Sequence, residues 1–355
     1  MENKGHQIII VAPKGTPLFK KAKKHGFKVY DISFNRLSIL RDYDRLKRVF
    51  RNERPDVVNT HGNEDAKLSL YAAQKMNVPL RILSRHISAH VRNAWYSRKL
   101  YKKYCHYVFT TSDYTTKHLK QVFKLNDMKV FTLPSGIAEP EKTLEKSEAV
   151  AQLRKELRLD TQTKFIGFVG RVSEDKGVSI ILKAFSKIKK RLPGYHIVIV
   201  GQGTDAYLNV LRNTAHKLDI AEKVHFTGFK ENIWPYYPAF ECKILPSIDM
   251  NGVPFEGIPQ SILESMICRC PVIGSKSGGI KDIIKDRETG LLFETENPSD
   301  LADKIMTTLN NQSQTARQVK AAYKKVKKYH TLDAMGKNII RIYRLHQVKL
   351  SRSSY

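Results

Sequence analysis

Short apolar segments that end in glycine recur through the second half of the chain and constrain its fold. Residues 165–169, 196–200 and 224–228 are rich in Val, Ile and Phe, and each ends at or just before a glycine. Helical patterns separate these segments, such as the apolar-periodic run at residues 178–188. Strands that alternate with helices form parallel sheets covered by helices on both faces. The pattern therefore predicts a doubly wound α/β domain.

The loop after the first of these strands carries two cations. Arg171 and Lys176 lie between Gly170, at the end of the strand, and the expected helix. Open parallel sheets bind their ligands at the carboxyl ends of the strands. Arginine neutralises a diphosphate through its planar fork, and lysine does so as a point charge. We interpret this loop as a phosphate-binding segment rather than as an ordinary solvated loop.

Two acids, Glu256 and Glu264, frame the most informative stretch of the sequence. Between them, Gly257, Ile258 and a proline lead into an apolar helix. Free backbone N–H groups and the positive end of a helix dipole should therefore lie beside the two carboxylates. Because carboxylates repel phosphate, we expect them to accept hydrogen bonds from sugar hydroxyls that flank a phosphate. The stretch predicts a nucleotide-sugar site.

The first half of the chain shows a noisier version of the same alternation. Strands are expected at residues 7–11, 28–32, 56–60, 81–86 and 107–112. Polar residues close the last three, so His61, His86 and Ser112 are expected at one edge of the sheet. His61 is left open between a structural and a functional role.

These residues together resemble a known family. From Val169 to Phe293 the chain looks like the carboxy-terminal half of the retaining GT-B glycosyltransferases of family 4. The resemblance rests on ordered blocks at residues 169–177, 200–203, 226–228, 246–247, 256–264, 271–274, 278–279 and 289–292. It implies an α/β GT-B fold, which consists of two Rossmann-like domains with a cleft between them.

The resemblance also implies domain boundaries. Residues 1–140 should form the acceptor-side domain and residues 141–325 the nucleotide-sugar-binding domain. A final helix within residues 326–355 should return to the first domain, and Thr331 is a predicted N-cap for it. Residues 136–164, which carry many charges, should join the two domains.

The family resemblance implies roles for single residues at the donor site. Arg171 and Lys176 would hold the donor diphosphate, and Glu264 would hydrogen-bond the ribose. Glu256, with the amides of Gly257 and Ile258, would meet the transferred sugar and the distal phosphate. The donor-site glycines would be Gly170 and Gly203, and His86 would lie near the transferred sugar.

The implied reaction transfers a sugar, with retention at the anomeric carbon, from a nucleoside diphosphate sugar to a lipid-linked or cell-envelope glycan. A UDP-sugar is the expected donor, and no cofactor or metal is expected. The sequence offers no obvious nucleophile, which fits a front-face route in which the diphosphate helps to deprotonate the acceptor. Arg171, Lys176 and the helix N-terminus would offset the charge of the leaving diphosphate.

One departure from the family concerns the start of the sequence. Family members normally begin with a strand, a Gly-rich loop and a helix before the stretch that resembles residues 4–13. This first βα unit is expected to be absent here, and two interior strands would then lack their shared neighbour. A catalytically impaired protein that binds sugar nucleotides or acts as a scaffold therefore stays open as an alternative.

The charge of the chain points to an acidic partner. The formal net charge of +28 favours an anionic membrane surface or nucleic acid. Nucleic acid is not expected, because no helix-turn-helix, zinc-finger or RNP pattern is present. No apolar run is long enough to span a membrane. We expect a cytoplasmic protein held by charge on the inner face of the cell membrane, with the aromatic and basic residues 92–103 as a candidate contact.

Cysteine usage agrees with a cytoplasmic location. The four cysteines are too few for a disulfide framework in a chain of this size. Cys268 and Cys270 have the wrong spacing for a zinc site, so we expect buried thiols. A GT-B epimerase or phosphorylase is a weaker alternative, because neither an additional acid/base set nor a cofactor lysine stands out.

Overall fold

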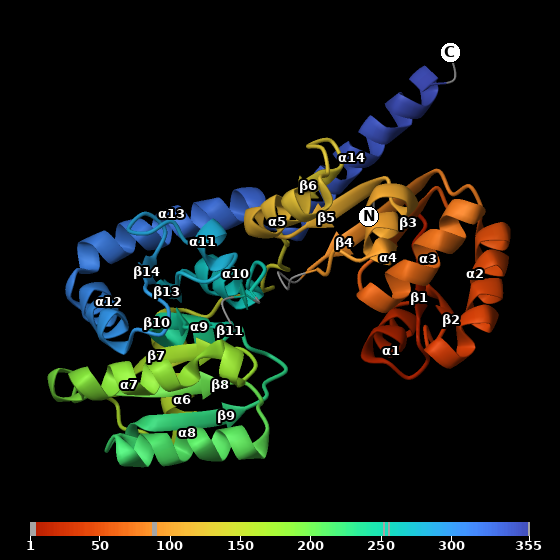
Figure 1. Cartoon of the computed structure of the whole chain (residues 1–355). Helices are drawn as coiled ribbons and strands as arrows, with labels where there is room; N and C mark the ends of the chain where they lie inside the picture. Colours follow the sequence, from red (N-terminus) through yellow and green to blue (C-terminus); the bar gives the residue numbers. More distant parts are fainter. Residues whose placement is uncertain (1–4, 87–90, 251–252, 255, 354–355) are drawn as a thin grey trace. The chain divides into compact units, whose positions relative to one another are not determined.

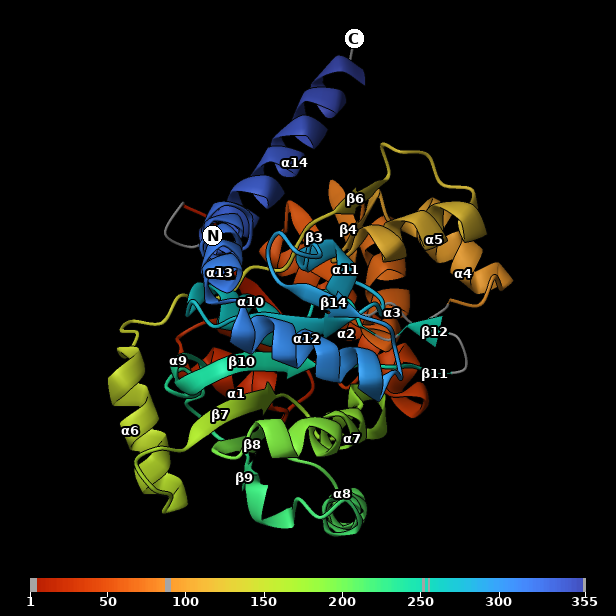
Figure 2. The same ribbon diagram turned by 90° about the vertical axis from the view of Figure 1, so that its left-hand side faces the viewer.

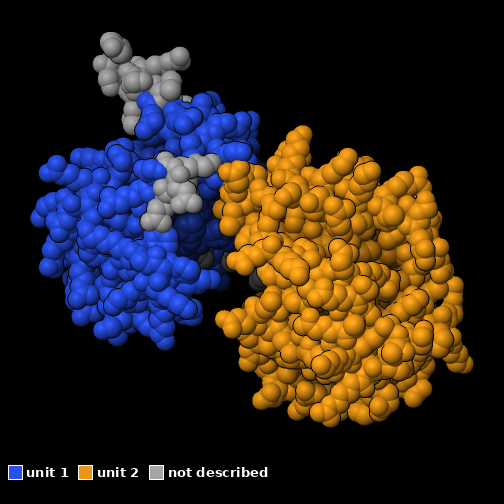
Figure 3. Space-filling view, turned by 180° about the vertical axis from the view of Figure 1, so that it is seen from behind, with its two compact units in different colours: residues 1–86, 90–133, 336–355 blue, residues 87–89, 134–335 orange. Residues whose placement is uncertain are grey.

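The computed structural model describes residues 5–86, 91–250, 253–254 and 256–353. The chain divides into two compact units, which are coloured in Figure 3. Unit 1 comprises Met1–His86, His90–Leu133 and Gly336–Tyr355. Unit 2 comprises Ile87–Ala89 and Pro134–Met335. These boundaries fall within about ten residues of positions 140 and 326, and each unit is described separately below.

Unit 2 contains a parallel sheet of six strands in the order β14-β13-β10-β7-β8-β9 (Figure 1). The strands are β7 (Lys164–Val169), β8 (Tyr195–Val200), β9 (Val224–Gly228), β10 (Phe240–Leu245), β13 (Val272–Ser275) and β14 (Leu291–Phe293). Each neighbouring pair runs parallel. The prediction of a doubly wound parallel sheet is therefore confirmed.

Helices cover both faces of this sheet. The first face carries α7 (Val178–Ile188), α8 (Asp205–Lys217) and α12 (Pro298–Asn310). Figure 2 shows α7 and α12 in front of β7 and β10. The second face carries α6 (Lys146–Leu157), α9 (Tyr236–Ala239), α10 (Gln260–Ile267) and α13 (Gln312–Tyr329). The β-branched and aromatic side chains of the strands are buried between these layers in one continuous core.

Short elements complete unit 2. They are η4 (Glu174–Lys176), η5 (Lys189–Arg191), η6 (Ala221–Lys223), α11 (Ile280–Ile283) and the two-stranded antiparallel ribbon of β11 (Asp249–Met250) and β12 (Val253–Pro254). All four cysteines of the chain are free and buried, and the predicted burial of Cys268 and Cys270 is confirmed.

Unit 1 contains two parallel sheets. The first pairs β1 (Ile9–Ala12) with β2 (Lys28–Asp31). The second has the order β3-β4-β5-β6 and consists of β3 (Val57–Thr60), β4 (Leu80–Arg85), β5 (Tyr107–Thr110) and β6 (Val130–Thr132). Among the described residues, β1 pairs with one neighbouring strand, β2, and β3 pairs with one neighbouring strand, β4. Val11 of β1 and Val58 of β3 nevertheless pack into one apolar cluster with α2 and α3.

The helices of unit 1 follow its strands. They are α1 (Pro17–Lys24), η2 (Arg36–Ser38), α2 (Ile39–Glu53), α3 (Asn63–Lys75), α4 (Trp95–Lys99), the π-helical η3 (Leu100–Tyr104) and α5 (Asp113–Phe123). In α5, the Oγ of Ser112 accepts a hydrogen bond from the amide of Thr115 at 3.3 Å. Ser112 thus caps a helix.

The last helix, α14 (Leu332–Ser353), contributes its residues from Gly336 onward to unit 1. Ile342 is buried against Leu80 and Tyr107, and the ring of His346 lies 3.2 Å from the Tyr107 hydroxyl. At the start of α14, the Oγ1 of Thr331 accepts a hydrogen bond from the amide of Ala334, so the predicted N-cap is confirmed. Among the described residues, none of the helices combines the length and apolar character that a membrane-spanning helix requires.

Candidate functional site

The site lies where the winding of the unit 2 sheet reverses. Strands β7 and β10 are neighbours, but the chain leaves β7 toward β8 on one side and leaves β10 toward β13 on the other. The chain therefore diverges from the carboxyl ends of β7 and β10, and such a point of reversal forms the crevice at which open parallel sheets bind ligands. The loop after β7 carries Arg171 and Lys176, and the segment after β10 leads to Glu256.

The ammonium of Lys176 contacts the carboxylate of Glu256 directly. The same Oε1 of Glu256 accepts a hydrogen bond from the Oγ of Ser247 at 2.7 Å. Glu256 is buried and Lys176 is half-buried. A buried carboxylate requires such partners, because losing its water is unfavourable. The structure thus brings together a predicted diphosphate ligand and the predicted sugar-binding acid.

Two glycines allow these segments to approach closely. Gly177 has φ +63°, and a Cβ there would lie 2.1 Å from the carbonyl oxygen of Pro246. Gly278 has φ +43°, and a Cβ there would lie 2.5 Å from the carbonyl oxygen of Glu256. Any larger residue would push the loop after β7 away from β10, or Glu256 away from its place. The next residue, Gly279, donates its amide to the same Glu256 carbonyl at 3.1 Å.

Arg171 is more exposed than Lys176. Its guanidinium lies 3.2 Å from the Oγ of Ser173 and 3.2 Å from a carboxylate oxygen of Asp175. Its side chain is 69% exposed. Arg171 can therefore turn toward a bound anion at little cost, whereas Lys176 is already held in the crevice by Glu256.

The other predicted donor-site glycines shape the backbone of this edge. Gly203 forms a parallel bridge with Val172, and a Cβ on Gly203 would lie 2.4 Å from the Val172 carbonyl oxygen. The amide of Gly170 donates to the carbonyl of Val200 at 3.0 Å. These contacts hold the start of the cation-bearing loop against the end of β8.

Helix α10 begins beside Glu256. Pro259 is its N-cap, and the proline offers no side-chain acceptor to the first amides of the helix. Gly257 and Ile258 are buried immediately before it. This arrangement can accept an anion, because both the amides and the helix dipole favour negative charge.

Glu264 lies on α10 and has a partner that the sequence did not reveal. The hydroxyl of Tyr237 donates to its Oε2 at 2.5 Å. Burial raises the pKa of Glu264, and the hydrogen bond from Tyr237 opposes this effect. Tyr237 is itself fully buried and lies within α9. Its hydroxyl fixes the position of one carboxylate oxygen of Glu264.

Lys243 was missed by the sequence analysis. It occupies the middle of β10, is fully buried, and donates to the Oγ of Ser261 at 2.9 Å. Burial lowers its pKa to about 7, while the carboxylates of Glu256 and Glu264 act in the opposite direction. The available signal was a lysine in the centre of an otherwise apolar strand. Lys243 supplies a buried, titratable charge beneath the first turn of α10.

His86 belongs to unit 1 and lies at the end of β4. Its Nε2 is 2.9 Å from the Nδ1 of His61, which follows β3, and the two rings are stacked with centroids 5.2 Å apart. Desolvation lowers the pKa of both imidazoles. The predicted convergence of His61 and His86 at one sheet edge is confirmed, and the role of each histidine stays a prediction. Within the described residues, no group of three or more His, Cys, Asp or Glu side chains could hold a metal ion.

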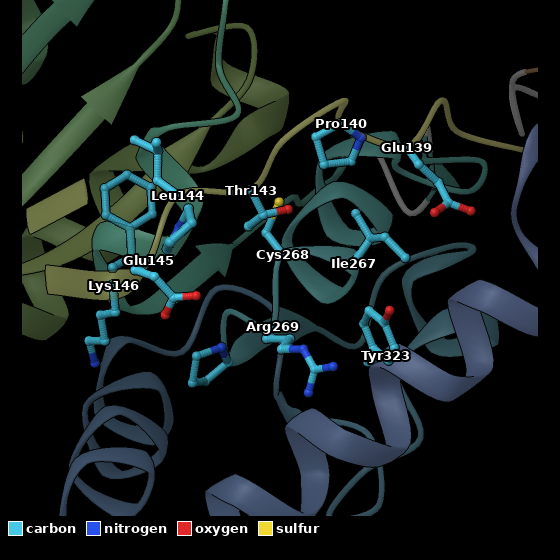
Figure 4. A pocket seen from close by; sticks show the side chains of 13 residues that line it. Glu139, Pro140, Thr143, Leu144, Glu145, Lys146, Ile267, Cys268, Arg269 and Tyr323 are labelled. Atoms are coloured by element: carbon cyan, nitrogen blue, oxygen red, sulfur yellow. The ribbon is translucent and has the colours of Figure 1, made fainter. Parts of the chain in front are cut away.

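A separate pocket of about 340 Å³ lies at the other end of the unit 2 strands, near their amino ends (Figure 4). It is lined at the amino ends of β10 and β13 by Phe240 and Pro271, and after α10 by Cys268 and Arg269. None of its lining residues is a predicted site residue.

Comparison with known proteins identifies glycosyltransferase families in both halves of the chain. Residues 1–139 match the model "Glycosyltransferase Family 4", and residues 150–325 match the model "Glycosyl transferases group 1". The chain belongs to the GT-B glycosyltransferases. The two matched segments correspond closely to the two units of the structure.

Solved structures resemble the chain over nearly its whole length. A glycosyltransferase from Rickettsia africae is 21% identical, with a TM-score of 0.86 over 98% of this chain and 92% of that one. Anabaena HepE in complex with UDP and glucose is 17% identical, with a TM-score of 0.77 over 94% of this chain and 98% of that one. At these identities the likeness establishes the fold, which is the predicted GT-B fold.

Two curated relatives are similar to the chain over about half of its length. A D-inositol 3-phosphate glycosyltransferase from Segniliparus rotundus is 27% identical over 51% of this chain and 39% of that protein. A GDP-mannose-dependent phosphatidylinositol monomannoside mannosyltransferase from Mycobacterium tuberculosis is 28% identical over 50% of this chain and 46% of that protein. The chain thus spans less than half the length of these two relatives.

Proposed function

We propose that the chain transfers a sugar from a nucleoside diphosphate sugar to an acceptor hydroxyl, with the donor bound at the crevice of unit 2. The observation that carries this proposal is the contact of Lys176 with Glu256 beside the N-terminus of α10. A cation, a helix N-terminus and a carboxylate meet there. Between them they offer partners for the diphosphate and for the hydroxyls of a sugar next to it.

Charge stabilisation is the main chemical effect of this arrangement. As the glycosidic bond to the diphosphate breaks, negative charge develops on the leaving oxygens. Lys176, Arg171 and the α10 amides would stabilise that charge. Glu256, freed from Lys176 by the diphosphate, then accepts hydrogen bonds from the sugar. Tyr237 holds Glu264 for the ribose hydroxyls.

The donor we propose is a UDP-sugar, and the reaction retains the anomeric configuration. Structures of HepE, which has the same fold, were solved with UDP and with UDP and glucose. Retention follows from a front-face route in which a diphosphate oxygen takes the proton of the acceptor hydroxyl. His86 of unit 1 would act near the transferred sugar.

The acceptor we propose is a lipid-linked or cell-envelope glycan, reached by a protein that lies on the cytoplasmic face of the membrane. A phosphatidylinositol monomannoside mannosyltransferase among the relatives supports a lipid-borne acceptor. The net charge of +28 supports attachment to anionic lipid. Trp95 and Tyr96 are exposed on α4, with the ammonium of Lys99 over the Trp95 ring at 4.8 Å, so residues 92–103 remain our candidate contact.

The test is a panel of sugar nucleotides offered to the purified protein together with a lipid-linked acceptor. Formation of nucleoside diphosphate from one donor, with an α product from an α donor by NMR, supports the proposal. A protein that binds sugar nucleotides but turns none over, with or without acceptor, would favour the scaffold alternative.

A further inference from the structure

An exposed apolar tip lies at the edge of the two-stranded sheet of unit 1. It consists of Leu37, Ile39 and Leu40, of which Leu37 is 96% exposed and Leu40 80% exposed. Soluble proteins expose single apolar side chains routinely, but adjacent ones usually mark a contact surface. Three of the four residues 37–40, where η2 passes into α2, are exposed and apolar. They therefore indicate a contact surface.

The tip is held outward by the fold rather than by a loose loop. The carboxylate of Asp42 is fully buried, and its Oδ2 accepts hydrogen bonds from Ser38 at 2.7 Å and Ser33 at 2.8 Å. The amide of Leu37 donates to the Oδ1 of Asn35 at 3.2 Å. These bonds define the turn from η2 into α2, on which Leu37 and Leu40 are exposed. Their exposure is therefore built into the structure.

One further exposed apolar residue, Leu18, lies near the same ends of the strands. Strands β1 and β2 are parallel, so the loops that follow them leave the sheet at one edge. The amide of Lys14 in the first loop donates to Asp31 at the end of β2 at 2.9 Å. Helix α1 begins directly after this loop, and Leu18 in its first turn is 58% exposed. Figure 1 shows β1 and β2 with α1 and α2 in the red to orange part of the chain.

Positive charge surrounds the tip. Arg36 and Arg41 flank it in sequence, and Arg41, Arg45 and Arg48 recur along one exposed side of α2. Helix α1 adds four exposed lysines, Lys20, Lys21, Lys23 and Lys24. The exposed acid of α2 that lies nearest to the tip in sequence is Asp44. Its Oδ1 forms an ion pair with the Nζ of Lys47 at 2.9 Å. A second copy of this chain would bring the same cations, so like charges would oppose dimerisation through this surface.

We propose that the apolar tip inserts into the interface of a bilayer that contains anionic lipids. Leucine side chains at the level of the acyl chains, with arginines and lysines at the level of the headgroups, form the pattern of an interfacial helix. This inference rests on the proposed membrane-facing function and deepens it: attachment combines insertion with charge, and part of it resists salt. Residues 92–103 and the α1 lysines then supply the salt-sensitive part.

The experiment compares the wild-type chain with Leu37→Ser/Leu40→Ser in cosedimentation with vesicles of phosphatidylglycerol and phosphatidylcholine. We expect the apolar variant to lose about tenfold or more in binding, most clearly at high salt, where charge is screened. The matched control is Met128→Ser/Val210→Ser, which removes two exposed apolar residues that lie before β6 and on α8. The control should bind as the wild type does.

A dye reports insertion directly. Because all native cysteines are buried, Leu37→Cys can be labelled selectively with an environment-sensitive fluorophore. Its emission should shift to the blue on anionic vesicles, whereas a label on Val210→Cys should not shift. Wild-type binding by the Leu37→Ser/Leu40→Ser variant, or an unshifted label at position 37, would overturn the proposal. A blue shift that depends on protein concentration without vesicles would overturn it in favour of self-association.

Failure of the insertion proposal can be distinguished from failure of the proposed transferase function. For the same variants, donor binding is measured by calorimetry, and stability is measured by thermal unfolding. If Leu37→Ser/Leu40→Ser binds both donor and vesicles as the wild type does, membrane insertion is refuted and the proposed donor site is not. The transferase proposal fails if no variant, including the wild type, binds a sugar nucleotide.

Discussion

Lys176 and Glu256 lie 80 residues apart in the chain and are in direct contact in the crevice of unit 2. At the proposed donor site, a diphosphate would therefore compete with Glu256 for the ammonium of Lys176. The exchange would be reciprocal, because the phosphate would take the cation and the carboxylate would become available to the sugar. Donor binding and the orientation of Glu256 would be coupled through this one pair.

Replacing Lys176 with Ala should weaken the binding of nucleoside diphosphate by about 1.5 to 3 kcal/mol, the scale of a lost charge-assisted hydrogen bond. Arg171→Ala should fall at the lower end of this range, because Arg171 is the more exposed cation. Calorimetry with UDP measures both effects. Lys183→Ala, an exposed lysine on α7, is the control and should bind as the wild type does. Unchanged affinity for UDP in both Lys176→Ala and Arg171→Ala would contradict the assignment of these two residues as diphosphate ligands.

Substitutions at Glu264 and Glu256 should have different effects on the binding of free nucleoside diphosphate. Glu264→Gln should weaken binding of free nucleoside diphosphate, because Glu264 is proposed to accept from the ribose hydroxyls. Tyr237→Phe removes the donor to Glu264 and should weaken the same ligand by a smaller amount, about 0.5 to 1.5 kcal/mol. Glu256→Gln should leave that affinity unchanged or raise it, because the variant no longer competes with the diphosphate for Lys176. The opposite pattern would mean that the roles of the two acids are exchanged.

Lys243 should make stability depend on pH. Its folded-state pKa of about 7 lies below the ordinary value of 10.5, so between these values the unfolded chain binds a proton that the folded chain does not. The wild type should therefore lose stability relative to Lys243→Met as pH falls from about 10 to about 7, and no further below that. Denaturant unfolding of both proteins across this window measures the difference. Parallel stability curves would show that Lys243 does not titrate there.

The same lysine should couple donor binding to protons. A diphosphate at the N-terminus of α10 adds negative charge above Lys243 and raises its pKa, so binding takes up protons and weakens as pH rises above about 7. Calorimetry in buffers of different ionisation enthalpy counts these protons. Lys243→Met should show none of this uptake. Equal proton uptake in both proteins would assign it to another group.

Charge on the face of residues 92–103 should control the salt-sensitive part of membrane binding. Charge reversal at Arg98, Lys99, Lys102 and Lys103 should remove most vesicle binding at low salt, at about 1 kcal/mol per residue near the surface. All four side chains are exposed. Binding to anionic vesicles should fall steeply between low and high salt in the wild type. Equal binding of the wild type to duplex DNA would reopen the nucleic-acid alternative.

Much of the fold could be predicted from local patterns. The apolar segment at residues 165–169 and the glycine after it anticipated β7 and its loop, because strand periodicity and glycine turns are local properties. The convergence of His61 and His86 also followed, since both close neighbouring parallel strands. Thr331 was recognised as an N-cap because its hydroxyl meets an amide only three residues away.

The pairings inside the site could not be predicted in the same way. The contacts of Lys176 with Glu256 and of Tyr237 with Glu264 join residues that only tertiary packing brings together. Lys243 was passed over because a lysine within an apolar strand gives no local sign of its depth. The exposure of Leu37 and Leu40 was equally hidden, because leucines at the start of a helix normally face the core.

Turnover by Glu256→Gln tests the central claim most directly. The donor panel is offered to the wild type and to this variant, and release of nucleoside diphosphate is followed with binding measured in parallel. The account predicts that a donor used by the wild type still binds the variant, while its turnover falls about 100-fold or more. Wild-type turnover by Glu256→Gln, or a wild-type protein that binds no sugar nucleotide at all, would contradict it.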